Sequence, residues 1–415
     1  MALGQSGRFE VTIVERGAVL GGLAGSFERE GRSYPLGYHH ILHRDKTLLY
    51  FLDLVGAMPR VKWRRINMLF RVGGRLYNLA RPADFLAFPM SLADKARFVL
   101  MMARAFAKSD WSDWQDRSAV DLLDSWAGPG VRRALFEPLT QLKFQLPCEA
   151  VSGAWLGARL HHREGSAALG YIPDANWTTV LCEGVARLVR EAGVLIRTAA
   201  AISAIHRSTA RVTSVELATG ENIEADIVLS TIPAETYIGI VPEDATPEMA
   251  RIRYSALVSV ICASKKPVSP DFYWMNLASL DRAASGIFLL NSLNPTIGQP
   301  GGSVVNFVTH MNHRGKPFFA KSDFELLESY LEDFRQIFGF DLDPYWTHIA
   351  RIPMYSPVFT TGYRNPPSRS VTYPNVYFAG NYRTFPSIVS TGTALRSGLD
   401  TANVILRDHG KGPTS

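Results

Sequence analysis

One stretch near the start of the chain, Phe9–Arg16, constrains the fold more than any other. Val11, Ile13 and Val14 form a short, β-branched apolar run, which is typical of a buried parallel strand. The run ends in the acid Glu15. In a dinucleotide-binding fold, an acid at the end of the second strand binds the ribose hydroxyls of the adenosine. The stretch therefore predicts a domain of this kind, and an ordinary exposed strand followed by an acid is the alternative.

The residues on both sides of this strand refine the prediction. Gly21 and Gly22 are adjacent and have no Cβ, so the backbone there can pass close to a ligand. The fingerprint G-x-G-x-x-G normally lies roughly 20 residues before the acid, which would place it before Met1. Residues 1–7 resemble the last turn of the helix that follows such a fingerprint, with Gly7 as its C-cap. We expect the first strand and the phosphate-binding turn of the fold to be missing.

Motifs further along the chain specify the class. Near the C-terminus, Asn375–Asn381 is typical of a buried strand that runs into a turn, and Ser390–Ala394 opens a helix. Phe136–Phe144 and Ala225–Pro233 lie between these motifs and the N-terminal strand. Taken in this order, the set resembles the flavoprotein superfamily of amine oxidases, protoporphyrinogen oxidases and phytoene desaturases. It is most similar to the bacterial protoporphyrinogen-oxidase-like branch, over nearly the whole chain.

The resemblance implies an α/β fold with two domains. One is a Rossmann-like FAD-binding domain built from discontinuous segments, and the other is a substrate-binding domain of mixed sheet and helices. We expect residues 1–45, 190–235 and 350–408 in the first domain, residues 46–189 and 236–349 in the second, and residues 409–415 as a polar tail.

The resemblance also implies FAD as the cofactor and assigns residues to it. Glu15 would bind the adenosine ribose, the backbone at Ile202 would meet the adenine, and Gly380 would approach the ribityl chain and the pyrophosphate. Asn381 stands where relatives often have Asp, and it can still hydrogen-bond a ribityl hydroxyl. The cofactor-binding residues expected in this way are Glu15, Arg16, Gly21, Gly22, Ser26, Ile202, Gly380, Asn381, Gly392 and Thr393.

The helix that opens at Gly392 and Thr393 is expected to direct its N–H groups and positive dipole end at the flavin pyrimidine. Nothing equivalent is expected at the pyrophosphate, because the amides of the missing turn would normally neutralise it. We therefore expect this chain to hold FAD poorly.

Flavin chemistry needs little from the protein besides orientation and electrostatics, so no catalytic residue is assigned with the motifs above. Three histidines, His39, His40 and His43, lie within five residues. No further His, Cys or Asp cluster completes a metal site, so no metal is expected. The resemblance places this segment beside the isoalloxazine ring, where His39 is a candidate ring-facing residue, with a structural or surface histidine as the alternative.

Three functions remain open at this point. The first is an FAD-dependent oxidase or dehydrogenase that removes a hydride from a small or lipophilic organic substrate. Electrons would leave to oxygen or a quinone-like acceptor, because no second nucleotide fingerprint is present. The second is a flavin isomerase similar to UDP-galactopyranose mutase, which the chain resembles at Gly21–Gly22 and Gly37–His43. The third is a non-catalytic, truncated flavoprotein homologue.

Composition limits the partners. The net charge of +6 and the pI of about 9.2 favour anionic substrates or anionic lipid surfaces. Basic residues are spread out, so no nucleic-acid partner is expected. The three cysteines have no C-x-x-C spacing, and neither a signal peptide nor an apolar run of 18 residues is present. We expect a cytoplasmic protein with a small-molecule substrate, and the oligomeric state stays open.

Several elements can be predicted from periodicity. Phe85–Ala107 is strongly apolar and helix-rich, with a capping signal at Ser91. It is either a core helix or a lid that contacts the inner face of the membrane for a lipophilic substrate. Strands are expected at 254–264, 285–294 and 303–311, a hairpin at Gly73–Gly74, a helical insertion over 70–170, and a helix at 322–339 that buries Phe324, Leu327, Leu331, Phe334 and Phe338.

Overall fold

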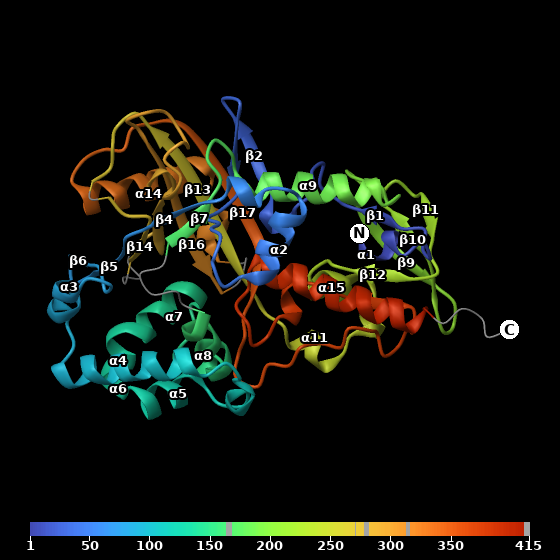
Figure 1. Cartoon of the computed structure of the whole chain (residues 1–415), viewed down its shortest axis with the longest axis horizontal. Helices are drawn as coiled ribbons and strands as arrows, with labels where there is room; N and C mark the ends of the chain where they lie inside the picture. The colour runs from blue at the N-terminus through green and yellow to red at the C-terminus, as the bar shows by residue number, and fades with distance from the viewer. Residues whose placement is uncertain (163–167, 270, 278–281, 313–315, 411–415) are drawn as a thin grey trace.

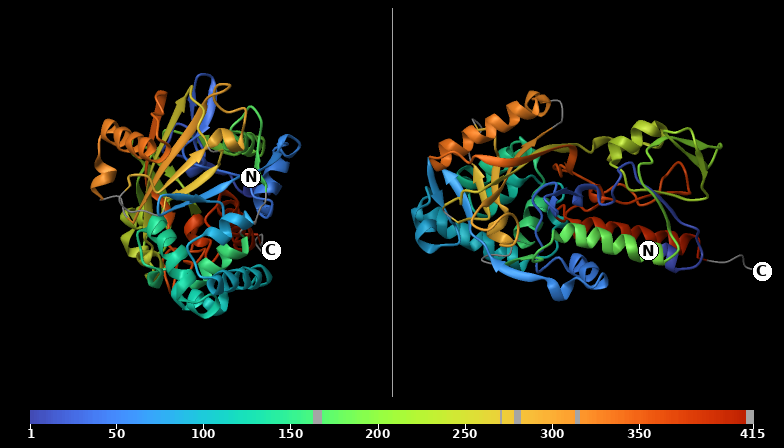
Figure 2. Two further views of the ribbon diagram at one scale, coloured as in Figure 1. Left: turned by 90° about the vertical axis from the view of Figure 1, so that its left-hand side faces the viewer. Right: turned by 90° about the horizontal axis from the view of Figure 1, so that it is seen from above.

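The computed structural model describes residues 1–162, 168–269, 271–277, 282–312 and 316–410. The chain forms two lobes (Figure 1). One lobe contains a large sheet and a cluster of helices, and the other is elongated, with two long helices along its length (Figure 2). The mixed α/β architecture agrees with the expectation from the sequence.

A seven-stranded mixed sheet forms the upper part of the first lobe, with the strand order β17-β13-β16-β15-β14-β5-β6. Strand β13, between β17 and β16, is buried along its whole length and consists mostly of apolar residues. Among the described residues, the only parallel pair in this sheet joins β14 and β5. The strands are β5 (Met68–Val72), β6 (Arg75–Tyr77), β13 (Tyr254–Ser264), β14 (Trp274–Leu277), β15 (Gly286–Leu289), β16 (Ser303–Met311) and β17 (Pro344–Pro357).

The predicted strands at 254–264 and 303–311 and the hairpin at Gly73–Gly74 are confirmed. The strand predicted at 285–294 is only half correct, because β15 ends at Leu289 and a helical turn, α12 (Leu290–Leu293), follows. Asn291 accepts a hydrogen bond from the backbone of Val304. Polar side chains that bond to the backbone in this way favour turns over strands.

Helix α14 (Asp323–Phe338) packs on one face of the large sheet. A capping box at Ser322 starts it and Gly339, with φ of 78°, ends it. The face predicted from the sequence is wrong at Phe324, which is 73% exposed. Phe334 is buried as predicted, and Leu327, Leu331 and Phe338 are partly buried against the same core. Leu326 and Tyr330, which were not predicted, complete the buried stripe.

The helical cluster below the sheet confirms the predicted insertion (Figure 1). Helix α8 is buried along seven of its ten residues and lies at the centre of the cluster. Ser91 caps α4 as predicted, and α4 buries Met101 and Ala105, so one face of this helix is core. The helices are α3 (Pro82–Ala87), α4 (Leu92–Ala107), α5 (Ala119–Trp126), α6 (Pro129–Val131), α7 (Glu137–Phe144) and α8 (Gly153–His162).

The second lobe contains two parallel strand pairs and a three-stranded antiparallel sheet. Strand β1 pairs with β8, and β12 pairs with β18. In the part of the chain that the structure describes, the other edge of β1 has no strand partner. The strands are β1 (Thr12–Val14), β8 (Leu195–Arg197), β9 (Ile202–Arg207), β10 (Val212–Leu217), β11 (Asn222–Glu224), β12 (Val228–Ser230) and β18 (Val376–Phe378).

Helices α9 and α15 run along this lobe (Figure 1). The expected domain boundary at residue 190 falls inside α9, which contacts β3, and the boundary at 350 falls inside β17. The remaining elements are α1 (Ala2–Gln5), β2 (Ser26–Arg29), β3 (Arg32–Pro35), α2 (Lys46–Leu54), β4 (Lys62–Arg65), β7 (Ala168–Tyr171), α9 (Trp177–Glu191), α10 (Ala234–Ile240), α11 (Pro247–Arg251), α13 (Pro317–Ala320) and α15 (Thr391–Asp408).

Candidate functional site

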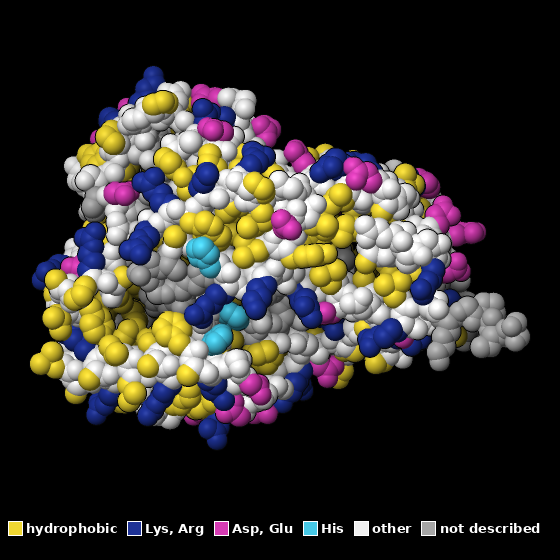
Figure 3. All heavy atoms as spheres, in the orientation of Figure 1, with side chains coloured by type: hydrophobic (Ala, Val, Ile, Leu, Met, Phe, Trp, Pro, Cys, Tyr) yellow, Lys and Arg dark blue, Asp and Glu magenta, His cyan; other side chains and the backbone are white. Residues whose placement is uncertain are grey.

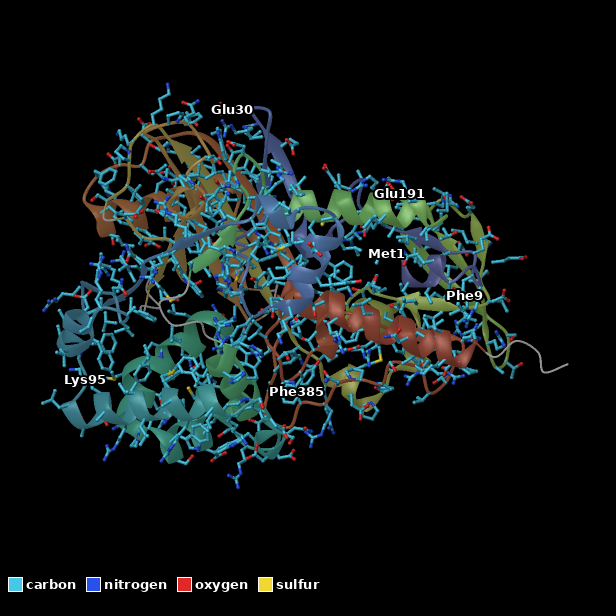
Figure 4. All side chains as sticks on the ribbon, viewed as in Figure 1. Met1, Phe9, Glu30, Lys95, Glu191 and Phe385 are labelled. Atoms are coloured by element: carbon cyan, nitrogen blue, oxygen red, sulfur yellow. The ribbon has the colours of Figure 1, made fainter. Side chains whose placement is uncertain are left out.

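A continuous cavity of about 2330 Å³ extends from one lobe into the other. Pockets for single ligands usually measure about 300–1,000 Å³, so this cavity has room for a cofactor and a substrate together. We call its two parts the β1 end, which is lined by β1, β12 and the start of α15, and the α8 end, which is lined by α7, α8 and the large sheet. Lys95 in the helical cluster and Glu191 at the end of α9 mark the two lobes in Figure 4.

Most residues expected from the sequence lie on this cavity. Those that line it are Glu15, Arg16, Gly21, Gly22, Ser26, His39, Ile202, Gly380 and Asn381. Gly392 and Thr393 do not line it, although their neighbours Thr391 and Ala394 do. Segments far apart in the sequence therefore converge at the β1 end.

Glu15 lies at the carboxyl end of β1, which is where ligands bind in open parallel sheets. Its backbone carbonyl accepts a hydrogen bond from Ala200, so the residue is held at the end of the β1–β8 pair. Its carboxylate accepts a hydrogen bond of 2.6 Å from the backbone N–H of Gly17. This contact fixes the acid beside the glycine-containing segment that follows.

The glycines at the β1 end are required by conformation and by close packing. Gly21 and Gly22 have φ of 130° and 53°, and a Cβ at Gly21 would lie 3.1 Å from the sulfur of Cys182. Gly380 has φ of 146° and donates its N–H to Ser397 on α15. At Gly21 and Gly380 the backbone also comes so close to neighbouring groups that a side chain would obstruct it, whereas Gly22 has open space and is favoured by its positive φ alone.

The N-terminus of α15 meets an acid that the sequence analysis missed. Ser390 donates a hydrogen bond to the Asp45 carboxylate at 3.1 Å, and any Cβ at Gly392 would overlap that carboxylate. Asp45 also accepts from the backbone N–H of Leu48 and so caps α2. One carboxylate therefore lies at the positive ends of two helices, and Gly392 lies against it.

His39 and His40 have different surroundings. His39 Nε2 is hydrogen-bonded to the carbonyl of Leu23 at 3.1 Å, and burial lowers its pKa. Its ring ties this segment to the loop that contains Gly22. Burial, followed by the charges of His39 and Arg159, lowers the pKa of His40 to about 4. Across the described ranges, no group of three His, Cys, Asp or Glu side chains is arranged for a metal ion.

The α8 end contains a group of polar residues that the sequence analysis did not single out: the half-buried Lys143 and Arg159 and the buried His310. Lys143 lies on α7, Arg159 on α8 and His310 on β16. Burial lowers the pKa of Lys143 and of Arg159, and it lowers that of His310 to about 3. Arg159 could have been found from the sequence by one signal, because it is a basic residue within the otherwise apolar run of α8.

The fold, the cavity that extends across both lobes, and the glycine turns beside an acid at the end of a strand are typical of a class of flavoproteins. The chain belongs to the family of flavin-containing amine oxidoreductases, whose family model matches residues 2–406. No protein with a curated description matches the sequence. No helix within the described residues is long and apolar enough to cross a bilayer.

Solved structures share the fold at low sequence identity. A candidate protoporphyrinogen oxidase from Exiguobacterium sp. 255-15 is 16% identical, with a TM-score of 0.76 over 98% of this chain and 96% of that one. A reduced UDP-galactopyranose mutase is 13% identical, with a TM-score of 0.74 over 99% and 91%. A putrescine oxidase with putrescine bound is 13% identical, with a TM-score of 0.71 over 98% and 96%.

FAD is the cofactor of this family, and the β1 end fits it. Tyr382 lines the cavity, and its buried hydroxyl has no hydrogen-bond partner among the described residues, which fits a wall that is completed by a ligand. Glu15, Gly21 and Gly380 would hold the cofactor along the same wall.

Proposed function

We propose that this protein is an FAD-dependent oxidase or dehydrogenase that removes a hydride from an organic substrate bound at the α8 end. The observation that carries the proposal is the single cavity, which extends from Glu15 and Gly380 at the β1 end to the α8 end in the other lobe. When bound, the flavin supplies the hydride acceptor. The protein then has to bind the substrate, orient it and exclude water.

Side chains of the large sheet and of the segment after β3 provide that environment. Tyr38 stacks on Phe288 at 4.0 Å between ring centroids, and Trp274 stacks on the same phenylalanine at 5.2 Å. All three rings line the cavity. They form a rigid apolar wall against which a flat or aliphatic substrate can be positioned.

The test is anaerobic reduction of the FAD-loaded protein. Candidate organic substrates are added without oxygen, and the visible flavin absorption is followed. The proposal expects bleaching by at least one substrate and recovery of the colour when oxygen or a quinone is admitted. A flavin that no candidate substrate reduces, while UDP-galactopyranose is converted to its furanose isomer by dithionite-reduced protein, would overturn it.

That isomerase remains the second candidate. It is supported by the structural likeness to UDP-galactopyranose mutase and by the basic residues at the α8 end.

We also propose that α4 lets the protein contact an anionic membrane surface. Leu92, Val99 and Phe106 are spaced seven residues apart on one helix face and are 75%, 56% and 38% exposed. Apolar side chains gather over α3 and α4 in Figure 3. An exposed apolar stripe on a basic protein suits peripheral binding to anionic lipid.

A further inference from the structure

We propose that the α8 end of the cavity binds an anionic group of the substrate, a carboxylate or a phosphate, on a largely apolar molecule. The substrate would then be an acid and not an amine, in spite of the family's name. The identification of this ligand as substrate rests on the proposed function, whereas the anion site itself does not.

Two cations share one aromatic ring at this site. The ammonium of Lys143 lies 5.7 Å from the ring centroid of Trp155, and the guanidinium of Arg159 lies 5.9 Å from a ring of the same residue. Trp155 and Arg159 are four residues apart on α8, which places them on one helix face. The arrangement brings two positive charges to one part of the cavity wall.

Neither cation is paired with an acid among the described residues. Within these ranges, the side chains of Lys143 and Arg159 form no hydrogen bond and no ion pair. Arg159 is instead close enough to the phenols of Tyr38 and Tyr355 to interact with them electrostatically. Contacts with aromatic rings offset only part of the cost of removing a charge from water. The two cations therefore have no negative charge beside them, and an anionic ligand would supply one.

His310 adds a third polar group that has no second partner. It is 8% exposed, and the alternation along β16 turns it to the cavity side with Val308, whereas Phe307 faces α14. Its Nδ1 is 3.1 Å from the hydroxyl of Ser285, and its buried Nε2 has no partner among the described residues. Because a hydroxyl can donate or accept, either tautomer leaves Nε2 free for a ligand.

The distribution of acids around the cavity favours the same conclusion. The acidic side chains among the described lining residues all lie at the β1 end: Glu10, Glu15, Asp45, Glu224 and Asp226. An ammonium group at the α8 end would find no carboxylate there and would face two cations. This would leave its charge unpaired and repelled.

Much of the rest of the α8 end is apolar, although Thr140, Asn276 and Ser285 also line it, and this apolar surface indicates the nature of the other part of the ligand. Its lining includes Phe136, Leu139, Phe144, Trp274 and Phe288. An acidic head beside Lys143 and Arg159 with an apolar body along these side chains would satisfy both surfaces. A free inorganic ion would use the charges and leave this apolar surface empty.

The experiment is calorimetric binding to the full chain, with four probes: decanoate, decyl phosphate, decylamine and inorganic phosphate. We expect saturable binding of decanoate or decyl phosphate, and the tighter of the two identifies the acidic group. Decylamine and inorganic phosphate should bind at least tenfold more weakly than the better acid. Equal or tighter binding of decylamine, or no binding of either acid, would overturn the proposal.

Variants locate the binding site. Lys143→Met and Arg159→Met should each weaken binding of the better acid about tenfold to a hundredfold, as expected for a lost charge-assisted hydrogen bond. Lys62→Met, at an exposed lysine of β4, should leave it unchanged. Thermal unfolding of each variant checks that it is folded, and a folded Lys143→Met, Arg159→Met double variant with wild-type affinity would refute the site.

A pH series separates charge from packing. Lys143 must be protonated to attract an anion, and its pKa is lowered by burial and by Arg159. Affinity should therefore fall as the pH rises through that lowered pKa, and Lys143→Met should lose this dependence. Binding does not require turnover, so a protein that binds decanoate and never reduces its flavin would sink the proposed function and leave this site standing.

Discussion

At the scale of the residue, Glu15 marks the β1 end of the cavity, and Lys143, Arg159 and His310 mark the α8 end. The acid was predicted from one apolar strand, and it lies at the end of β1 on the cavity. The Lys143–Arg159–His310 group was not predicted, because its members come from two helices and a strand that only tertiary packing brings together. Asp45 was missed for the same reason, because it caps α2 but also accepts a hydrogen bond from Ser390 at the start of α15, far away in the sequence.

We expect Glu15→Ala to weaken FAD binding about tenfold to a hundredfold, because charge-assisted hydrogen bonds to the ribose would be lost. Glu15→Gln keeps an acceptor for the Gly17 N–H and so tests the charge alone. Glu28→Ala, at an exposed acid of β2, is the matched control. Quenching of FAD fluorescence measures the dissociation constant, and an unchanged value in Glu15→Ala would refute the assignment.

At the scale of the element, strands with a continuous apolar run and helices with a clear cap were predictable. Strands β13 and β16 and helices α4 and α14 begin and end within a residue or so of the positions expected. The buried face of α14 was predictable only in part, because the sequence contains apolar residues on more than one side of that helix. Phe334 is buried as expected, but contact with the sheet also buries Leu326 and Tyr330 and leaves Phe324 in solvent.

Helix α8 is packed too tightly to accept a larger residue at Gly157. A Cβ there would overlap the indole of Trp111. Overpacking of this kind costs about 1–3 kcal/mol. We expect Gly157→Ala to lower the free energy of unfolding by about that amount in urea, whereas Gly239→Ala on α10, with open space around it, should not lower it. Equal stability of the two variants would contradict this packing.

The exposed stripe of α4 predicts membrane binding that depends on its apolar side chains. Wild-type protein should sediment with vesicles of phosphatidylglycerol and phosphatidylcholine. The triple variant Leu92→Ser, Val99→Ser, Phe106→Ser should do so several-fold less. Phe324→Ser, which removes an exposed apolar residue of α14, is the control. Sedimentation of the triple variant at the wild-type level would argue against the α4 surface.

At the scale of the whole molecule, each lobe lines one end of the cavity, and the two ends differ in chemistry. The β1 end carries the acids and glycine turns that suit a dinucleotide, and the α8 end carries cations and aromatic walls. The order of the motifs in the sequence was sufficient to predict the α/β class and the cofactor. The charge of the substrate was not predictable, because it depends on which side chains remain unpaired after folding.

The account depends most on the claim that the β1 end binds FAD, and titration of the purified protein with FAD tests it directly. We expect a saturable change in the visible spectrum that reaches one FAD per chain. We expect saturation only with added cofactor, because the N-terminus of α2 is already capped by Asp45 and that of α15 by Ser390, so neither is open to the pyrophosphate. A spectrum that remains that of free FAD at every concentration would contradict the account.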